Sequence, residues 1–242
     1  MGTFDLIVIG AGAVGSASLR AAAAAGARVL GLEQYTPANP RGSSHGHSRI
    51  FRHAYFEHPD YVPLLRHATA RLESLERESG TRLLHRCGML LMGAAGCPAV
   101  SGAIESAQRW GLPLDVLDAT GIRSRFPWFD VSDDTHGAFE ANAGIVRPEA
   151  TVHATVRVAM ARGAELRTAR RVEAVVEDDT GVSVVTASGT ERAAAVIIAA
   201  GPWAPVLMPE LKPWLRVTRV VQAWLEPQDG TDASAMPCWL YD

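Results

Sequence analysis

The first 33 residues alternate short apolar runs with an alanine-rich stretch. Residues 4–9 are mostly apolar and end at Gly10, the pattern of a strand buried on both faces of a parallel sheet. Alanine dominates residues 13–25 and Gly26 follows, so this stretch predicts a helix with a glycine after its end. Residues 28–32 predict a second strand. Together these elements form a β-α-β unit.

The next stretch interrupts this rhythm. Residues 34–57 contain few periodic apolar positions and many Gly, Pro, Ser and His residues, so they predict one long loop. Loops of this length in compact domains are usually functional or disordered. Residues 60–79 carry apolar side chains at helical spacing, with Gly80 after them, and predict an amphipathic helix.

The rest of the chain predicts a second domain inserted into the first. The elements that depart from the β-α-β pattern are a strand at 87–92, a helix at 99–110 and irregular or strand-like sequence at 135–146. The pattern then returns with a helix at 149–162, a strand from 165, two meander strands within 172–192 joined at 179–181, and a strand at 194–199. A last strand is expected at 215–225. The expected fold class is therefore α/β, with one domain formed by residues 1–80 and 146–203 and another by residues 81–145 and 204–242.

Composition excludes several classes of partner. The 242 residues carry a net charge of −3, so nothing in the overall charge favours nucleic acid or an anionic membrane. No run reaches the roughly 18 uncharged apolar residues of a membrane span. The three cysteines are far apart and lack CxxC spacing, so we expect neither disulfides nor a metal site, and a reducing, cytoplasmic setting. The sequence leaves the oligomeric state open.

A glycine motif stands at the end of the first predicted strand. Gly10, Gly12 and Gly15 form GxGxxG, and Glu33 follows at the end of the second strand, 23 positions after Gly10. In this context Gly10 allows a tight turn, Gly12 lets the backbone approach a pyrophosphate, and Gly15 lets the helix pack closely on the strand. Glu33 is placed to accept hydrogen bonds from ribose hydroxyls. A ligand-free glycine turn is the less favoured alternative.

Two further stretches narrow the choice of dinucleotide. Residues 41–55 read RGSSHGHSRIFRHAY, with three Arg and three His in a chain of slightly negative charge, and residues 196–204 read VIIAAGPWA. Together with DLIVIGAGAVGSA at the start, they make the chain resemble the FAD-dependent amine and amino-acid oxidases, over its whole length. The resemblance implies a Rossmann-like, GR2-type FAD-binding domain with an inserted α+β substrate domain, and FAD as the cofactor.

The resemblance also implies roles for individual residues. Arg52 is similar to the arginine that binds the substrate carboxylate, whereas Arg49 and His45 are similar to residues beside the flavin ring, where positive charge would stabilise the anionic reduced flavin. Besides the glycines and Glu33, the residues similar to FAD contacts are Ser43, Ser44, Ser48, Val172, Gly201 and Trp203. His47 and Ser44 depart from the acidic residue and the histidine expected at their positions. His53 and His58 are expected to be surface hydrogen-bonding or solvated residues of the loop, not catalytic ones.

The implied reaction is oxidation of the C–N bond of a secondary (N-methyl) amino acid such as sarcosine or N-methyltryptophan, with O2 as acceptor and H2O2 as product. One alternative is a flavin-dependent amino-acid dehydrogenase with another electron acceptor. Chains of this family continue beyond residue 242, so we expect a chain truncated at its C-terminus, with an incomplete substrate domain. A catalytically impaired fragment is therefore the second alternative. The sequence does not identify the amine.

Overall fold

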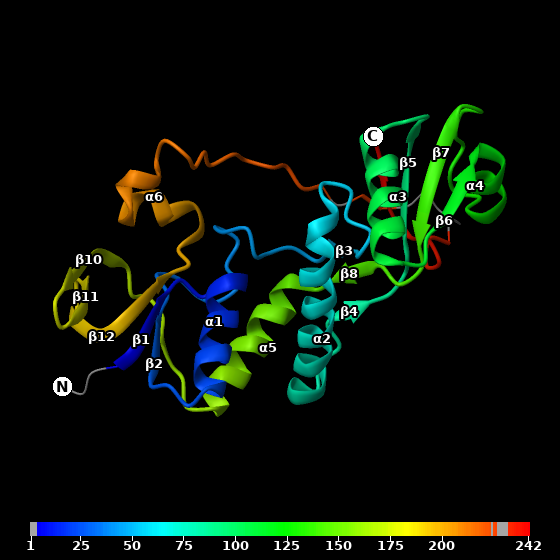
Figure 1. The fold of residues 1–242 in the computed structure, drawn as a ribbon. Helices are drawn as coiled ribbons and strands as arrows, with labels where there is room; N and C mark the ends of the chain where they lie inside the picture. The colour runs from blue at the N-terminus through cyan, green and yellow to red at the C-terminus, as the bar shows by residue number, and fades with distance from the viewer. Residues whose placement is uncertain (1–3, 224, 227–231) are drawn as a thin grey trace. The chain divides into compact units, whose positions relative to one another are not determined.

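The computed structural model describes residues 4–223, 225–226 and 232–242 (Figure 1). The chain divides into two compact units. The first unit comprises Met1–His47, Leu75–Thr81 and Arg147–Gln222, and the second comprises Ser48–Ser74, Arg82–Val146 and Ala223–Asp242. The segments of the two units thus alternate along the sequence, and the architecture is the expected α/β fold.

The first unit is built on a six-stranded mixed sheet. Its strand order is β10-β11-β12-β1-β2-β9, in which the pairs β12–β1, β1–β2 and β2–β9 are parallel and the β10–β11–β12 meander is antiparallel. The strands are β1 (Phe4–Ile9), β2 (Val29–Leu32), β9 (Glu165–Arg167), β10 (Val172–Asp178), β11 (Gly181–Thr186) and β12 (Gly189–Ile198).

Alternate side chains of β1 enter two different cores, as the two faces of a strand require. Val8 packs with Leu19 of α1 (Ala13–Ala24) and Ala159 of α5 (Pro148–Ala161), so these two helices cover one face of the sheet. Ile7 and Ile9 enter the core on the other face. Burial on both faces explains why residues 4–9 form an almost unbroken apolar run.

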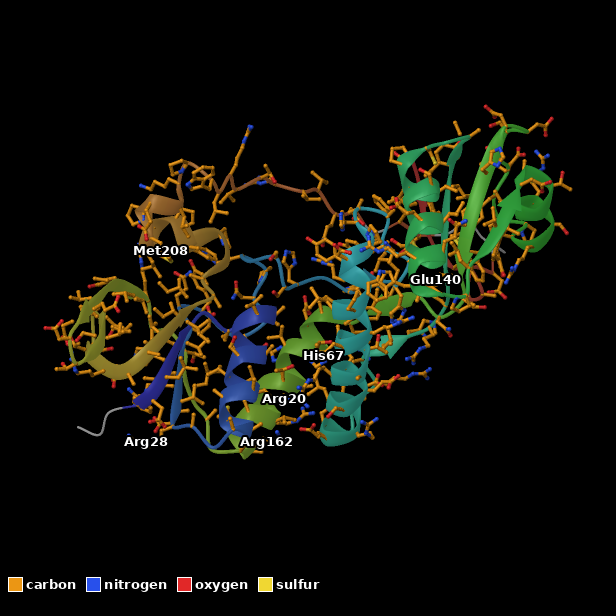
Figure 2. The ribbon with its side chains drawn as sticks, viewed as in Figure 1. Arg20, Arg28, His67, Glu140, Arg162 and Met208 are labelled. Atoms are coloured by element: carbon orange, nitrogen blue, oxygen red, sulfur yellow. The ribbon has the colours of Figure 1, made fainter. Side chains whose placement is uncertain are left out.

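The C-terminal end of α2 (Val62–Ser79) belongs to the first unit. Glu78 pairs with Arg20 of α1 at 2.5 Å and with Arg162, just after α5, at 2.7 Å, and both arginines are labelled in Figure 2. Arg157 of α5 also donates to the carbonyl oxygen of Ser79 at 3.0 Å. Because these two arginines share the Glu78 carboxylate, this end of α2 is joined to both sheet-covering helices. After β12 the unit continues with short helical turns at Gly201–Trp203 and Pro209–Leu211 and with α6 (Ala204–Leu207).

The second unit contains two sheets. The larger has the order β13-β5-β7-β6, and the smaller has the order β3-β8-β4. Helix α3 (Pro98–Trp110) supplies Val100 and Ala103 to a core with Met89, Leu91 and Ala138 of the larger sheet. The remaining elements are the turn Pro59–Tyr61, α4 (Ala119–Arg125), β3 (Arg49–Phe51), β4 (Leu84–His85), β5 (Met89–Ala94), β6 (Asp115–Asp118), β7 (Thr135–Glu140), β8 (Gly144–Val146) and β13 (Cys238–Tyr241).

The strongly periodic elements are confirmed, and two expectations are wrong. Residues 34–57 are not one continuous loop, because β3 lies within them and pairs with β8. The described residues of the stretch 215–225 contain no strand; residue 224 lies outside the described residues. The short elements β4, β6, α4 and β13 were not predicted. Compactness groups residues 48–74 with the second unit and 204–222 with the first, while the assignment of a cofactor domain and a substrate domain stays a prediction.

The three cysteines are free thiols. None of the helices in the part of the chain that the structure describes is long and apolar enough to cross a membrane.

Candidate functional site

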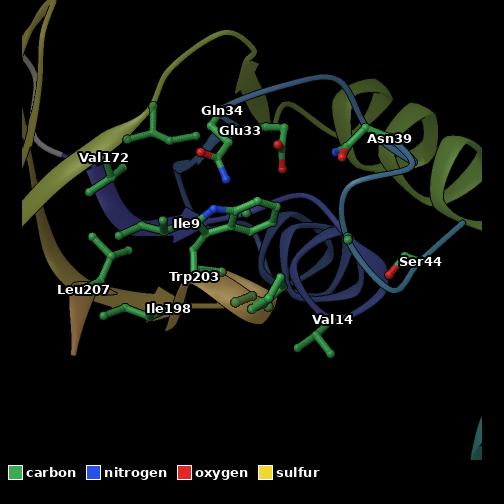
Figure 3. Close-up of a pocket in the computed structure, with 18 of the residues that line it drawn as sticks. Ile9, Val14, Glu33, Gln34, Asn39, Ser44, Val172, Ile198, Trp203 and Leu207 are labelled. Atoms are coloured by element: carbon green, nitrogen blue, oxygen red, sulfur yellow. The ribbon is translucent and has the colours of Figure 1, made fainter. Parts of the chain in front are cut away.

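A pocket of about 380 Å³ lies in the first unit, at the carboxyl ends of β1, β2 and β12 (Figure 3). This volume is within the range of small-molecule sites. The chain leaves β1 toward β2 on one side, whereas β12 pairs on the other side, and open α/β sheets bind ligands at such a reversal. The predicted cofactor residues that line the pocket are Gly10, Gly12, Glu33, Ser43, Ser44, Val172, Gly201 and Trp203.

The glycine turn is specified by close backbone contacts. Gly10 has a φ of +94°, and a Cβ there would lie 2.5 Å from the carbonyl oxygen of Ala199. A Cβ on Gly15 would lie 1.8 Å from the carbonyl oxygen of Gly10. Gly15 therefore does not line the pocket but allows α1 to begin directly against the end of β1. The structural part of the predicted GxGxxG geometry is present.

The N-terminus of α1 opens toward the pocket and is partly capped by the loop. Gly12 is the N-cap and supplies no side chain, while the Ala13 N–H donates to the Ser44 hydroxyl at 2.9 Å. Free N–H groups and the helix dipole make such a terminus attractive to anions. A contact across 31 positions therefore places Ser44 at the N-terminus of α1, on the lining of the pocket.

Glu33 is a buried carboxylate, 6% exposed, immediately after β2. Its Oε2 accepts a hydrogen bond from the Ala11 N–H at 2.8 Å, and its Oε1 accepts one from the Tyr35 N–H at 2.9 Å. Each carboxylate oxygen can accept a second bond. The backbone thus holds the carboxylate in place and leaves acceptor capacity for hydroxyl groups of a ligand.

The opposite wall of the pocket is apolar. Val172, Ile198 and Leu207 contribute to it, and Figure 3 shows the indole of Trp203 projecting into the pocket. The ring of Trp203 lies 5.7 Å from that of Tyr35, tilted by 56°. A planar aromatic ligand entering the pocket therefore meets the indole.

Sequence reasoning missed several lining residues, chiefly Gln34, Asn39, Arg170 and Arg171. Gln34 directly follows Glu33, so its place after β2 was a usable signal. Arg170 and Arg171 precede β10, and the Arg170 N–H donates to the Glu33 carbonyl oxygen at 2.9 Å. That contact joins segments far apart in the sequence, so no local pattern could reveal it.

The remaining predicted residues do not line the pocket. His45 is half-buried in the first unit, near the Gly46 N–H that donates to Glu149 at 2.9 Å. Ser48, Arg49 and Arg52 belong to the second unit. Arg49 lies on β3, where its Nη1 donates to the carbonyl oxygen of Ser48 at 2.8 Å.

Arg52 is held by an aromatic and acidic environment within the second unit. Its guanidinium carbon lies 4.5 Å from the ring centre of Tyr55 and 4.7 Å from that of Phe56. Its Nη2 donates to both oxygens of Glu57, at 2.9 and 2.7 Å. Stacking and carboxylate binding are the two interactions that a guanidinium forms best.

His58 is exposed as predicted, with 58% of its side chain accessible, whereas His53 forms hydrogen bonds as predicted but is largely enclosed instead of lying at the surface. Only 15% of the His53 side chain is accessible, and Nδ1 contacts Glu140 at 2.9 Å. His53 is enclosed because it binds the buried carboxylate of Glu140, which lies far from this loop in the sequence. Within the described ranges, no group of three or more His, Cys, Asp or Glu residues is placed to hold a metal ion.

Comparisons with known proteins agree with this geometry. The family profile described as FAD dependent oxidoreductase matches residues 5–240. The chain is 42% identical over 228 residues to a monomeric sarcosine oxidase of Streptomyces avermitilis, covering 94% of this chain and 59% of that protein. It is 38% identical over 223 residues to an N-methyl-L-tryptophan oxidase of Citrobacter koseri, covering 92% and 59%. It therefore spans about three fifths of the length of these relatives.

The solved structures that resemble this chain also include oxidases. The structure of NikD, described as an unusual amino acid oxidase essential for nikkomycin biosynthesis, superposes with a TM-score of 0.79 at 32% identity, over 87% of this chain and 55% of NikD. Glycine oxidase from Geobacillus kaustophilus superposes with a TM-score of 0.73 at 22% identity, over 87% of this chain and 59% of that chain. This second likeness concerns the fold alone.

Proposed function

Because this chain belongs to the family of FAD-dependent oxidoreductases, we propose that its first unit binds FAD in the pocket at the ends of β1 and β2. We further propose that the protein oxidises the C–N bond of an N-methyl amino acid, with O2 as the electron acceptor. The observation that carries the proposal is the convergence of the glycine turn, the N-terminus of α1 and the Glu33 carboxylate on one pocket.

The residues present fit a dinucleotide. A Cβ at Gly12 would lie 3.1 Å from the Ser44 hydroxyl, so the absence of a side chain leaves the backbone open to a phosphate group. The N–H groups of α1 and the Ser44 hydroxyl would donate to the pyrophosphate. Glu33 would accept from ribose hydroxyls, and the apolar wall at Val172 and Leu207 suits an adenine ring.

FAD, when bound, would supply the two-electron acceptor for the substrate C–H bond, with O2 as the final electron acceptor. The chain's own contribution is to bind and orient the substrate. Arg52 would bind the substrate carboxylate in place of the Glu57 carboxylate, with which its guanidinium pairs in the structure. Fixing the carboxylate limits the directions from which the C–H bond can face its acceptor.

The other assignments remain predictions. Arg49 and His45 are proposed to place positive charge near the flavin, and Ser43, Ser48, Gly201 and Trp203 to contact FAD. The first and second units are proposed as the cofactor and substrate domains. Sarcosine and N-methyltryptophan are the proposed substrates because relatives of this chain are named for them. The cytoplasmic location expected from the cysteine pattern also stays a prediction.

The binding part of the proposal can be tested with the purified chain. After incubation with FAD and gel filtration, the protein should retain a flavin absorbance band, and FAD titration should quench tryptophan fluorescence through Trp203. Trp203→Phe should reduce the quenching without abolishing binding. Gly42→Ala is a matched control, because Gly42 lines the same pocket and a Cβ there meets nothing within 4 Å. A colourless chain that takes up no FAD would refute the proposal for this chain.

The catalytic part needs an oxygen electrode and a peroxide assay. Sarcosine and N-methyltryptophan should consume O2 and release H2O2, while glycine and tryptophan, which lack the N-methyl group, should react poorly. Reduction of an artificial dye by the same substrates without peroxide formation would instead identify a dehydrogenase. A chain that binds FAD but oxidises neither substrate would contradict the proposed reaction while leaving the cofactor site intact.

A further inference from the structure

Glu140 is a buried carboxylate in the second unit that the proposed reaction leaves unused. It ends β7, is 3% exposed, and is labelled in Figure 2. Its oxygens accept from the His53 N–H at 3.0 and 2.9 Å and from the Ala54 N–H at 2.8 Å, and Oε1 contacts His53 Nδ1 at 2.9 Å. An ionised carboxylate only accepts hydrogen bonds, so His53 Nδ1 donates here. A single side chain thus binds three donors from two consecutive residues.

The His53 ring is held at its other nitrogen as well. Nε2 lies 2.7 Å from the Thr69 hydroxyl of α2, and that hydroxyl contacts the carbonyl oxygen of Leu65 at 3.0 Å. The ring therefore links β7 to α2 within the second unit. The hydrogen bonds to the Glu140 carboxylate are charge-assisted and therefore stronger than neutral ones, so they hold the backbone at residues 53–54 firmly in place.

Arg52 stands between two backbone anchors. On its N-terminal side, β3 pairs with β8, with Arg49 opposite Val146 and Phe51 opposite Gly144. On its C-terminal side, His53 and Ala54 are bound by Glu140, four positions before β8 begins. The segment 140–146 therefore holds the backbone of Arg52 from both sides, although it lies about 90 positions away in sequence.

These anchors also decide the surroundings of the Arg52 side chain. Tyr55 and Phe56, which lie against the guanidinium, follow directly after the two residues bound by Glu140. The side chain of Arg52 is 12% exposed, and its Nε is buried without a hydrogen-bond partner among the residues that the structure describes. The guanidinium is thus oriented by packing that depends on the position of residues 53–56.

We propose that Glu140 is a positioning residue for substrate recognition: by binding His53 and Ala54, it fixes the direction in which Arg52 presents its guanidinium to a carboxylate. The inference rests on the proposed function, in which Arg52 binds the carboxylate of the amino-acid substrate. Glutamate suits the position because its two oxygens accept all three donors at once, whereas glutamine would turn an NH2 group toward an N–H donor.

The test is a double-mutant cycle with Arg52→Gln and Glu140→Gln in the full, FAD-loaded chain. Anaerobic calorimetry with the flavin reduced beforehand, so that the substrate cannot be oxidised, measures the Kd of sarcosine and of sarcosine methyl ester, which lacks the negative charge. Each single variant should weaken sarcosine binding about tenfold, the scale of one charged hydrogen bond. The double variant should bind sarcosine no more weakly than Arg52→Gln, because Glu140 acts through Arg52. Ester binding should change less than twofold.

Two further variants serve as controls. Glu149→Gln removes a different carboxylate that holds the loop, through the Gly46 N–H, and should leave the Kd of sarcosine unchanged. Thr69→Val removes only the outer partner of His53 and should weaken sarcosine binding two- to threefold, so it tests the idea even if Glu140→Gln does not fold.

The outcomes distinguish the carboxylate-binding role of Arg52 from the positioning role of Glu140. Unchanged sarcosine binding in Arg52→Gln would remove the carboxylate role of Arg52 from the proposed function, and the role of Glu140 with it. A normal Arg52→Gln defect combined with additive effects of Glu140→Gln, or with equal losses for sarcosine and its ester, would overturn the positioning role alone. Unchanged sarcosine binding in both Glu140→Gln and Thr69→Val would also overturn the positioning role of Glu140.

Discussion

Among the three glycines of the GxGxxG motif, Gly15 leaves the least space for a Cβ, so Gly15→Ala tests the turn geometry most directly. The new Cβ would lie 1.8 Å from the Gly10 carbonyl oxygen and 2.8 Å from the Gly10 carbonyl carbon, both main-chain atoms. Real Cβ contacts essentially never fall below 3.0 Å, so α1 must move away from the end of β1 by more than 1 Å. That movement would loosen the contact of Leu19 with Val8, two side chains that are at most 1% exposed.

The expected cost follows from this geometry. Overpacking of a core costs typically 1–3 kcal/mol, and here no flexible side chain can absorb the clash, so we expect about 3 kcal/mol. This is a large part of the roughly 5–15 kcal/mol by which domains are stable. The same shift displaces the N-terminus of α1, and FAD affinity should therefore fall as well.

Urea unfolding, followed by circular dichroism, measures the loss of stability, and FAD titration measures the loss of binding. Gly42→Ala adds the same methyl group in open space at the same pocket, and should lie within about 0.5 kcal/mol of the wild type. Gly12→Ala should be intermediate, since its Cβ meets only the Ser44 side chain at 3.1 Å. If Gly15→Ala unfolds at the wild-type urea concentration and binds FAD equally well, the steric reasoning is wrong.

Three other predictions concern charges and thiols. Glu33→Gln should lose about 1.5–3 kcal/mol in urea unfolding and bind FAD more weakly, because its amide NH2 must face one of two backbone N–H donors; unchanged stability would contradict this. Burial, followed by the neighbouring Cys87 thiol, raises the pKa of Cys238 to about 12, so iodoacetamide at pH 8 should label Cys238 far more slowly in the folded chain than in urea, as peptide mass spectrometry can show. Hydrogen bonds from Arg192 and then Thr180 hold the pKa of Asp178 below its ordinary value. Asp178 therefore contributes stability above pH 4 that is lost as the pH falls further, and the difference between wild type and Asp178→Asn in urea midpoint should shrink from pH 7 to pH 2.5; a constant difference would refute the coupling.

Local sequence was enough to predict the nucleotide half of the site. Residues 4–33 form a β-α-β unit whose contacts are short in sequence, and the roles of Gly10 and Gly15 follow from one turn between β1 and α1. Glu33 contacts the Ala11 N–H only 22 positions away. Because periodicity and glycine spacing report such local geometry directly, the fold class and the pocket could be anticipated.

The substrate side of the loop depended on contacts that no local pattern contains. His53 was expected at the surface, yet only 15% of its side chain is accessible and it contacts Glu140, 87 positions away. Likewise, β3 is a strand only because β8 pairs with it. Conversely, the described part of the apolar stretch 215–225 contains no strand, because β propensity has little effect without a partner strand. The glycine turn and the helix and strands around it therefore follow from residues close together in the chain. The position of Arg52 depends instead on long-range contacts, since its anchors are supplied by distant parts of the chain.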